Sequence, residues 1–543
     1  MTSLNSKHVQ IICIFFICVI ISILCYENFI YSSNFGLLSF RSINDTAFQL
    51  SLKNIHDQFY NMRLYSLISM NDYGYGWIYW FSMSIITYPF YLLNKFYDIA
   101  WPLIVIPRQI SLFLNCLTLI YLSKLFRLFN FDKISSSVSL LCFSLLPFFG
   151  YLSLEFSTAN SILLFSALSF YLACLEYRNE QKLQKSLISL SIAGGIKLSG
   201  LFIAPLVFLI LFSCKSVKKN YKDFLIKVFY FTLAVVFFTN PTIFFYVLTP
   251  FKFLGGEEIN SALINYFSSM KLFLRNSTLA PVVSNNLESF ISGVFCNYYV
   301  FTVFIILFIG YILLLFKNIK NRLFLLAFLF FSFLPLFYLF ANVNNRVNAG
   351  CYFTSISFIF FLGLQSFHKS IKNIMLFSIL SLIVWSLISE NLLKHSYINP
   401  FAYFIKAASN KDNLIKSERI KTCLQLPNVN NLKLSFALDF QIPTELNPRQ
   451  YPSSCFAYIY SNLSPSILCS SKFDYFILDM SSPVFLNDIE FNSFLSSQDK
   501  RLNNDFLNDR MYKNRIVNDH VFNGSKYNLL CSVDNINVYK LEP

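Results

Sequence analysis

Charged residues are scarce in this chain: they make up 13% of its 543 residues, while 55% are hydrophobic and 19% aromatic. Soluble globular proteins carry about 25% charged residues, so this composition excludes an ordinary soluble globule. Uncharged apolar runs of roughly 17–25 residues, the length that a helix needs to cross a bilayer, recur along the chain. The sequence therefore predicts an integral membrane protein that crosses the bilayer many times.

Familiar catalytic motifs are absent as well. The sequence has no P-loop, no zinc-protease or nucleophile-elbow pattern and no Rossmann fingerprint. Its five histidines show no spacing typical of metal ligands. The net charge of +15 could indicate nucleic-acid binding, but the Lys and Arg residues lie in short clusters between apolar runs. Such clusters follow the positive-inside rule, so we expect a membrane and no nucleic acid as partner.

The apolar runs predict the spanning helices. The first run, 9–25, is followed by no small-residue cleavage site, so we expect a retained span with the N-terminus in the cytoplasm. Later uncharged runs cover 111–122, 134–152, 156–175, 186–214, 228–249, 298–316, 323–341, 351–367 and 374–389. The basic clusters lie at 124–133, 178–185, 215–222, 317–322 and 369–372, and the positive-inside rule places all of them in the cytoplasm.

Run 76–93 decides the topology, because it is apolar enough to cross the bilayer. If it crossed, every later basic cluster would lie outside. Its aromatic residues, among them Trp77 and Trp80, suit a helix at the membrane surface, so we predict an outer juxtamembrane helix. Basic residues at both ends of 186–214 then predict a helical hairpin, with Lys197 near the outer leaflet.

Together these choices predict an all-α polytopic membrane protein with about eleven transmembrane helices. The membrane domain covers 1–394 and has outer loops at 26–107 and 250–297. A soluble outer domain of α/β or α+β class follows at 395–543.

The soluble domain carries its own signals. Stretches 432–440, 473–478 and 536–539 have the composition of β-strands. Its four cysteines predict at least one disulfide in an oxidising compartment, in any of three pairings. These cysteines are Cys423, Cys455, Cys469 and Cys531.

Charged residues on the predicted outer side are the candidate functional residues. Asp45 lies in the first outer loop, where Asn-Asp-Thr suits either a helix cap or a catalytic acid. Glu155 lies at the outer end of a span, where acids are rare. Arg108 and Lys197 either anchor their helices by snorkelling or bind an anion. Arg346, between two long apolar runs, could grip a lipid phosphate with its planar guanidinium.

The order of these features resembles that of the GT-C glycosyltransferases, specifically the family 39-like bacterial relatives of protein O-mannosyltransferases and lipid A aminoarabinose transferases. One span precedes a large outer loop with an early Asp, as Asp45 does here. The segments that carry the resemblance are 73–80 (YGYGWIYW), 108–115 (RQISLFLN), 191–201 (SIAGGIKLSGL), 239–242 (TNPT) and Arg346 ahead of Cys351. The chain departs from the family in two ways: segment 73–80 lacks the family's prolines, and Asn160 stands where members often carry an Asp.

The resemblance implies inverting transfer of a sugar from a polyprenyl-phosphate donor to a hydroxyl of a lipid, glycan or protein, at the outer face of a bacterial inner membrane. Asp45 is the implied general base. Arg346, supported by Lys197, would hold the donor phosphate, and Arg108 would add to substrate binding. Glu155 would bind the acceptor or a divalent metal, although no residue pattern requires a metal or another cofactor.

Two other classes of function compete with this interpretation. A transporter or flippase of a lipid-linked or amphipathic substrate would also use sparse charges within its spans. The absence of an internal repeat and the large one-sided outer domains count against it. An envelope scaffold anchored by its spans would leave Arg346 and Lys197 without a role.

Overall fold

The structure, a computed structural model, describes residues 6–33, 52, 55–61, 76–97, 101–128, 131–145, 147–154, 156, 158–179, 185–214, 217, 220–241, 305, 309, 436–438, 475–479, 515–522, 524–533 and 536–542. The chain forms two compact units. The first comprises Met1–Asn28, Ser51–Pro89 and Ile106–Lys406, and the second Phe29–Leu50, Phe90–Val105 and Ala407–Pro543. The boundary at 89/90 falls inside a helix, at Pro89, where the missing N–H weakens the helical ladder.

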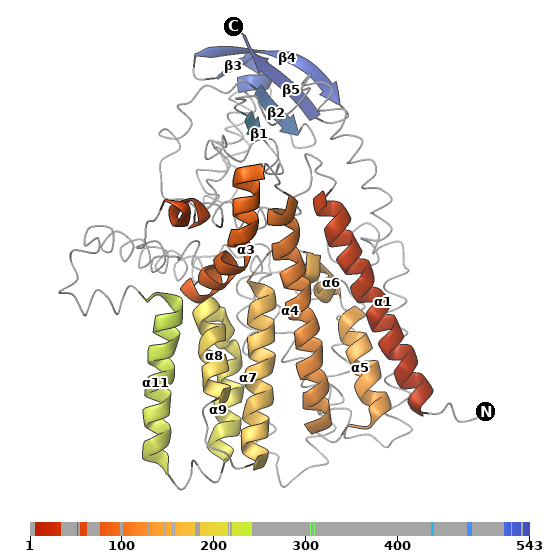
Figure 1. Ribbon diagram of the computed structural model, residues 1–543, viewed down its shortest axis with the longest axis vertical. Coiled ribbons are helices and arrows are strands. Elements are labelled where there is room, and N and C mark those ends of the chain that lie inside the picture. Colours follow the sequence, from red (N-terminus) through yellow and green to blue (C-terminus); the bar gives the residue numbers. More distant parts are fainter. Residues whose placement is uncertain are drawn as a thin grey trace, which may run out of the picture. The chain divides into compact units, whose positions relative to one another are not determined.

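Helices make up most of the described part of the first unit (Figure 1). They are α1 (Ser6–Ser33), α3 (Trp77–Tyr97), α4 (Trp101–Leu128), α5 (Lys133–Leu145), α6 (Pro147–Leu154), α7 (Ala159–Asn179), α8 (Lys185–Ile196), the 3-10 helix η2 (Leu198–Ile203), α9 (Ala204–Ser213) and α11 (Tyr221–Thr239). Figure 1 shows α4, α7, α8 and α11 running side by side. Leu, Phe and Ile side chains from these helices form the core between them.

Within the described residues, three helices are long and apolar enough to cross a membrane: Lys7–Phe29, Val105–Leu128 and Ala159–Asn179. Helix α3 is not among them. Large apolar side chains such as Phe15 and Phe16 of α1 and Phe229 of α11 are exposed, which suits contact with lipid better than contact with water. The chain is thus mainly helical, as expected, with three candidate membrane spans in its described part.

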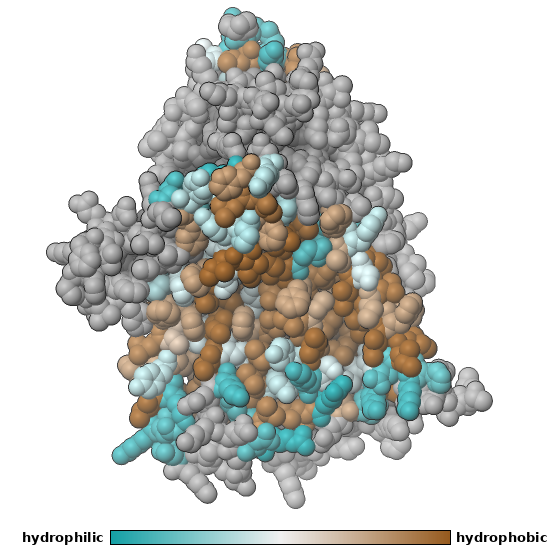
Figure 2. Space-filling view, viewed as in Figure 1, coloured by the Kyte–Doolittle hydropathy of each residue, from teal (hydrophilic) through white to brown (hydrophobic). Residues whose placement is uncertain are grey.

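Charged residues gather at one end of these helices, where α4 and α7 end and α5, α8 and α11 begin. Figure 2 shows hydrophilic residues along this edge and apolar residues over the rest of the helices. The Nη1 of Arg178, at the end of α7, donates to the carbonyl of Leu128, the last residue of α4, at 3.3 Å. We call this edge the basic end. Its cations are Lys124, Arg127, Lys133, Arg178, Lys185, Lys222 and Lys227.

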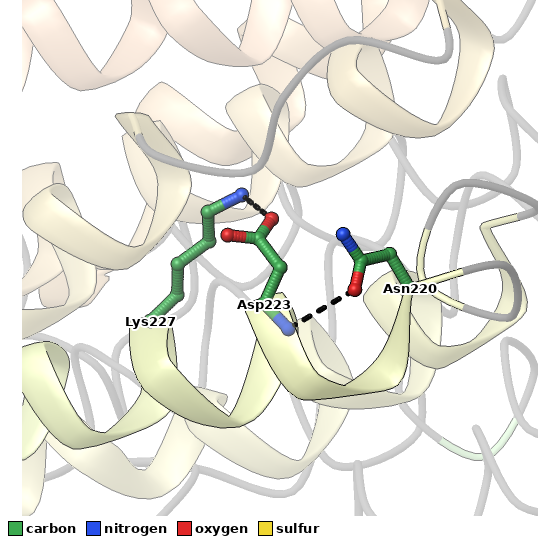
Figure 3. Close-up of polar contacts among 3 residues, drawn as sticks. All are labelled: Asn220, Asp223 and Lys227. Atoms are coloured by element: carbon green, nitrogen blue, oxygen red, sulfur yellow. Dashed lines mark hydrogen bonds and ion pairs between the residues drawn. The ribbon is translucent and has the colours of Figure 1, made fainter.

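Three acids at the basic end are used to start helices or to pair with a lysine. Glu176 accepts hydrogen bonds from the backbone N–H groups of Lys185 and Ser186, the first residues of α8, at 3.0 and 3.2 Å. Asp132 caps α5 through Ser135. At the start of α11, Asn220 accepts from the Asp223 N–H at 3.3 Å, and the Asp223 carboxylate pairs with Lys227 (Figure 3). These acids therefore have local structural roles.

The predicted hairpin over 186–214 is present. Lys197 is extended (φ −160°, ψ 139°) and ends α8, after which the chain turns back through η2 into α9. A Cβ added at Gly200 would lie 2.1 Å from the carbonyl oxygen of Ala193. Residues seven apart in a continuous helix are about 10 Å apart, so this approach requires a reversal of the chain.

Two predicted runs have different limits in the structure. Run 134–152 was expected as one span but forms two helices, α5 and α6, because Pro147 cannot continue a helix and instead starts α6. Run 111–122 is only the middle of α4, which begins at Trp101 and places Arg108 well inside the helix. The expected spans after residue 249 lie outside the described residues, apart from the helical positions 305 and 309.

The described part of the second unit contains a five-stranded sheet in the order β1-β2-β5-β4-β3. Its strands are β1 (Phe436–Leu438), β2 (Tyr475–Asp479), β3 (Val521–Phe522), β4 (Ser525–Val533) and β5 (Ile536–Leu541). β1 pairs with β2 in parallel, and the other neighbours are antiparallel. All three stretches predicted as strands, 432–440, 473–478 and 536–539, therefore contain one.

Two local features shape this sheet. Asn523 and Gly524 join β3 to β4, and Gly524 has φ +75°, which an Asn-Gly hairpin turn requires. Cys531 in β4 is disulfide-bonded, as predicted for at least one of the four cysteines, and its partner lies outside the described residues. The full extent of the predicted soluble domain, 395–543, also lies mainly outside them and stays a prediction.

Candidate functional site

Two of the five candidate site residues, Arg108 and Lys197, lie in the described residues, and both are far from the basic end. Arg108 is in the first third of α4, and Lys197 follows the last residue of α8. Because α4 ends and α8 begins at the basic end, both residues belong to the opposite end of the first unit (Figure 1). We call this the apical end. Asp45, Glu155 and Arg346 lie outside the described residues, so their roles stay predictions.

Arg108 is fully buried, with 0% of its side chain exposed. Snorkelling requires a path to water, so a surface anchor does not describe this guanidinium. The Asn28 side-chain amide donates to the Arg108 carbonyl at 3.4 Å and to the Ser153 carbonyl at 2.9 Å. Charges buried within the apolar depth of a membrane protein are functional candidates by default, and Arg108 meets that description.

Arg108 belongs to a polar stripe on α4 that the sequence analysis missed. Ser111, Asn115 and Thr118 follow it at three, seven and ten residues, and all four are buried. This is the spacing of one helix face. The Asn115 amide donates to Ser153 Oγ at 2.8 Å. Polar residues at helical spacing from a buried arginine were the signal that could have revealed this stripe.

Lys197 is half-buried at the turn between α8 and η2. Its carbonyl accepts from the Gly200 N–H at 2.8 Å. The Ile196 carbonyl, one of the last of α8, accepts from the Gly76 N–H at 2.8 Å. Gly76 immediately precedes α3, so a backbone hydrogen bond ties the start of α3 to the residue before Lys197.

A close backbone contact, which we call the glycine junction, joins Gly76, Gly195 and Phe238. A Cβ added at Gly76 would lie 1.6 Å from the Gly195 carbonyl oxygen, and one added at Gly195 would lie 2.3 Å from the Phe238 Cβ. The rings of Trp77 and Phe237 pack at 5.6 Å. Only glycine permits such approach. The junction brings together segments 73–80, 191–201 and the residues just before Asn240, which the sequence analysis singled out separately.

The same turn of α3 contacts the residue after Glu155. The rings of Tyr79 and Phe156 stack with centroids 6.3 Å apart, and both side chains are buried. Gly76 and Tyr79 are three residues apart, which is about one turn of helix. Positions 155 and 197 are therefore each adjacent to a residue that contacts the first turn of α3.

His56 lies on a short helix at 55–60 and is buried against α3. Its Nε2 is 3.0 Å from Thr87 Oγ1 and 3.3 Å from the Ser84 carbonyl oxygen. Thr87 donates its own proton to the Met83 carbonyl, so both groups facing Nε2 are acceptors, and Nε2 carries the proton.

The charge of His56 follows from its burial. Burial lowers the pKa of His56 from 6.5 to about 4, against smaller opposing effects of the Ser84 carbonyl and Asp57. At neutral pH His56 is a neutral hydrogen-bond donor that fastens its helix to α3, and it has no acid–base role there.

No group of three or more His, Cys, Asp or Glu side chains that could hold a metal occurs among the described residues. Comparison with protein-family models, with curated proteins and with solved structures finds no match to this chain. A functional proposal therefore rests on the residues themselves and on how the structure brings them together.

Proposed function

We propose that this protein is a membrane glycosyltransferase that moves a sugar from a polyprenyl-phosphate donor to an acceptor hydroxyl, with inversion, at the outer face of the membrane. The observation that supports this most is the glycine junction. It joins three segments that are far apart in the chain and that resemble successive elements of one enzyme family. Beside the junction lies Lys197, a cation of the kind that a donor phosphate needs.

The proposed reaction needs one base and a site for the leaving phosphate. Asp45 accepts the proton of the acceptor hydroxyl while that oxygen forms a bond to the anomeric carbon. The bond from the anomeric carbon to the phosphate oxygen breaks, and the polyprenyl phosphate leaves with the electron pair. Arg346 and Lys197 neutralise the charge that develops on the phosphate. A half-buried cation interacts more strongly with that charge than one in water does.

Arg108 and Glu155 complete the proposed site. Arg108 contributes to substrate binding at the apical end, and its full burial means that it acts on groups that enter the protein or through its neighbours. Glu155 binds the acceptor, which is a lipid, a glycan or a protein, or a divalent metal.

The proposal includes a topology of about eleven spans in a bacterial inner membrane, with the N-terminus in the cytoplasm and the C-terminal domain outside. The basic end supports the orientation, because Lys and Arg concentrate on the cytoplasmic side of membrane proteins. The apical end then faces outward, with Arg108 and Lys197 at the depth where a lipid-linked donor presents its phosphate.

A transporter or flippase is the second candidate, and the interruption of α8 at Lys197 favours it. Transporters often bind substrates at helices that break within the membrane, where backbone groups become available. In this chain the carbonyls at the break are taken by Gly76 and Gly200, which leaves fewer backbone groups for a substrate.

Mass analysis of envelope glycans and lipids from cells with and without the gene separates the two functions. A transferase predicts a glycan or lipid that lacks one defined sugar mass in the cells without the gene. Unchanged covalent structures, with a lipid-linked intermediate retained on the cytoplasmic leaflet, would replace the transferase by the transporter.

A further inference from the structure

The short helix α6 ends at Leu154, directly before Glu155, and its last carbonyls are held by side chains from other helices. The terminal carbonyls of a helix lack partners within it. The Asn160 amide donates to the Leu152 carbonyl at 2.8 Å, and the Asn28 amide donates to the Ser153 carbonyl at 2.9 Å. Asn115 donates to Ser153 Oγ at 2.8 Å. We call Asn28, Asn115 and Asn160 the carboxamide clamp.

The clamp residues come from three different helices, α1, α4 and α7, and all are 0% exposed. Their orientation is fixed, because rotating any amide by 180° would place its oxygen against an oxygen that now accepts. The α6 end is thus held from three sides by groups with a defined geometry. Tyr79 packs on Phe156, which places a fourth contact just beyond Glu155.

The clamp does not serve stability well. Among the described residues, the Oδ1 atoms of Asn28, Asn115 and Asn160 are buried without a hydrogen-bond partner. Each unsatisfied buried acceptor costs about 1–3 kcal/mol, whereas a typical hydrogen bond contributes about 0.5–1.5 kcal/mol. Apolar side chains of similar size would pack there at lower cost. The balance favours a role in fixing position.

We propose that the carboxamide clamp positions Glu155 by fixing the end of α6, so that Asn28, Asn115 and Asn160 are positioning residues for the acceptor side of the active site. The effect on sugar transfer rests on the proposed function, whereas the fixed position of the α6 end does not depend on it. The clamp acts through Glu155 and has no direct contact with substrate.

Asn115→Leu tests the clamp, and Thr118→Val is its matched control. Both positions are fully buried on the same face of α4, but Thr118 bonds only to Leu114 of its own helix. Asn115→Leu keeps the volume and removes a half-satisfied amide, so we expect an unchanged or higher thermal midpoint. Hydrogen exchange at residues 152–156 should become faster, and transfer should fall about 10–100-fold, as for other supporting residues. Thr118→Val should change neither.

A double variant tests whether Asn115 acts through Glu155. In a Glu155→Gln background, Asn115→Leu should cause no further loss of transfer, because the group that it positions is already gone. Losses that multiply in full would overturn the proposal, and so would exchange at 152–156 no faster than in Thr118→Val. A wild-type protein without transfer activity would refute the proposed function, and the exchange comparison would then decide the clamp by itself.

Discussion

The contact between Gly76 and α8 allows a prediction worked from distances. In Gly76→Ala the new Cβ would lie 1.6 Å from the Gly195 carbonyl oxygen, and ordinary contact begins at 3.4 Å. The neighbour is backbone and cannot rotate away, so α3 and α8 must separate by more than an ångström. That movement also stretches the Gly76 N–H to Ile196 carbonyl bond, now 2.8 Å. Overpacking of about 1–3 kcal/mol and a lost hydrogen bond of about 1 kcal/mol give roughly 2–4 kcal/mol of destabilisation.

The functional effect of Gly76→Ala should exceed the loss of stability. Ile196 immediately precedes Lys197, so the separation displaces the cation proposed to hold the donor phosphate. A misplacement of about 1 Å can lower a rate about 100-fold, which is the loss of transfer that we expect at a temperature where the variant is folded. Thermal unfolding and a transfer assay, each on purified protein in nanodiscs, measure the two effects.

Gly194→Ala is the control for this prediction. Its Cβ would meet the end of the Leu201 side chain at 2.4 Å, and that side chain can change rotamer. Alanine also favours the helix by about 1 kcal/mol over glycine. We therefore expect Gly194→Ala to stay within a few fold of wild-type activity. Equal behaviour of the two variants would refute the reasoning from the glycine junction.

Three further predictions follow from other parts of the chain. Reporter fusions after Lys133 should report cytoplasm and a fusion after Pro543 the outside; an outside signal after Lys133 would mean that 76–93 spans. Arg346→Lys keeps the charge but loses two-point contact with phosphate, so donor KM should rise, and an unchanged KM would move the phosphate site. His56 has a lowered pKa of about 4, so the unfolded state binds its proton first as pH falls from 6.5 towards 4. Stability should be complete above pH 6.5 and lower by about 2 kcal/mol at pH 5, and His56→Gln should remove this slope in thermal unfolding.

Much of the helical arrangement could be predicted from uninterrupted apolar runs. Runs 9–25 and 156–175 correspond to α1 and α7, because no proline or charge divides them. Lys197 marked the hairpin for a physical reason, since a cation flanked by basic clusters at equal distances needs a turn of the chain there. Alternating residues similarly predicted β1, β2 and β5.

The remaining errors have identifiable causes. A search for uncharged runs stops at Arg108, whereas α4 continues through it because this residue is buried among other polar groups. Pro147 divided a run whose hydropathy is continuous, because hydropathy does not register a missing N–H.

The candidate site could be predicted only in part. Arg108 and Lys197 stood out because charges are rare in apolar runs. Asn28, Asn115 and Asn160 are uncharged and lie in separate helices, so their common contact with α6 depends on packing that no local pattern contains.

Transfer of labelled sugar by purified Asp45→Asn protein tests the central claim most directly. The assay uses a radiolabelled polyprenyl-phosphate sugar as donor and a detergent extract of the native membrane as the source of acceptor. Asparagine keeps the shape of Asp45 but cannot take a proton at neutral pH, so transfer should fall about 10²–10⁴-fold. The thermal midpoint should stay unchanged, and Asp57→Asn should remain near wild type. Transfer by Asp45→Asn at nearly the wild-type rate would contradict the assignment of the base, and loss in none of the Asp45, Asp57 and Glu155→Gln variants would contradict the transferase itself.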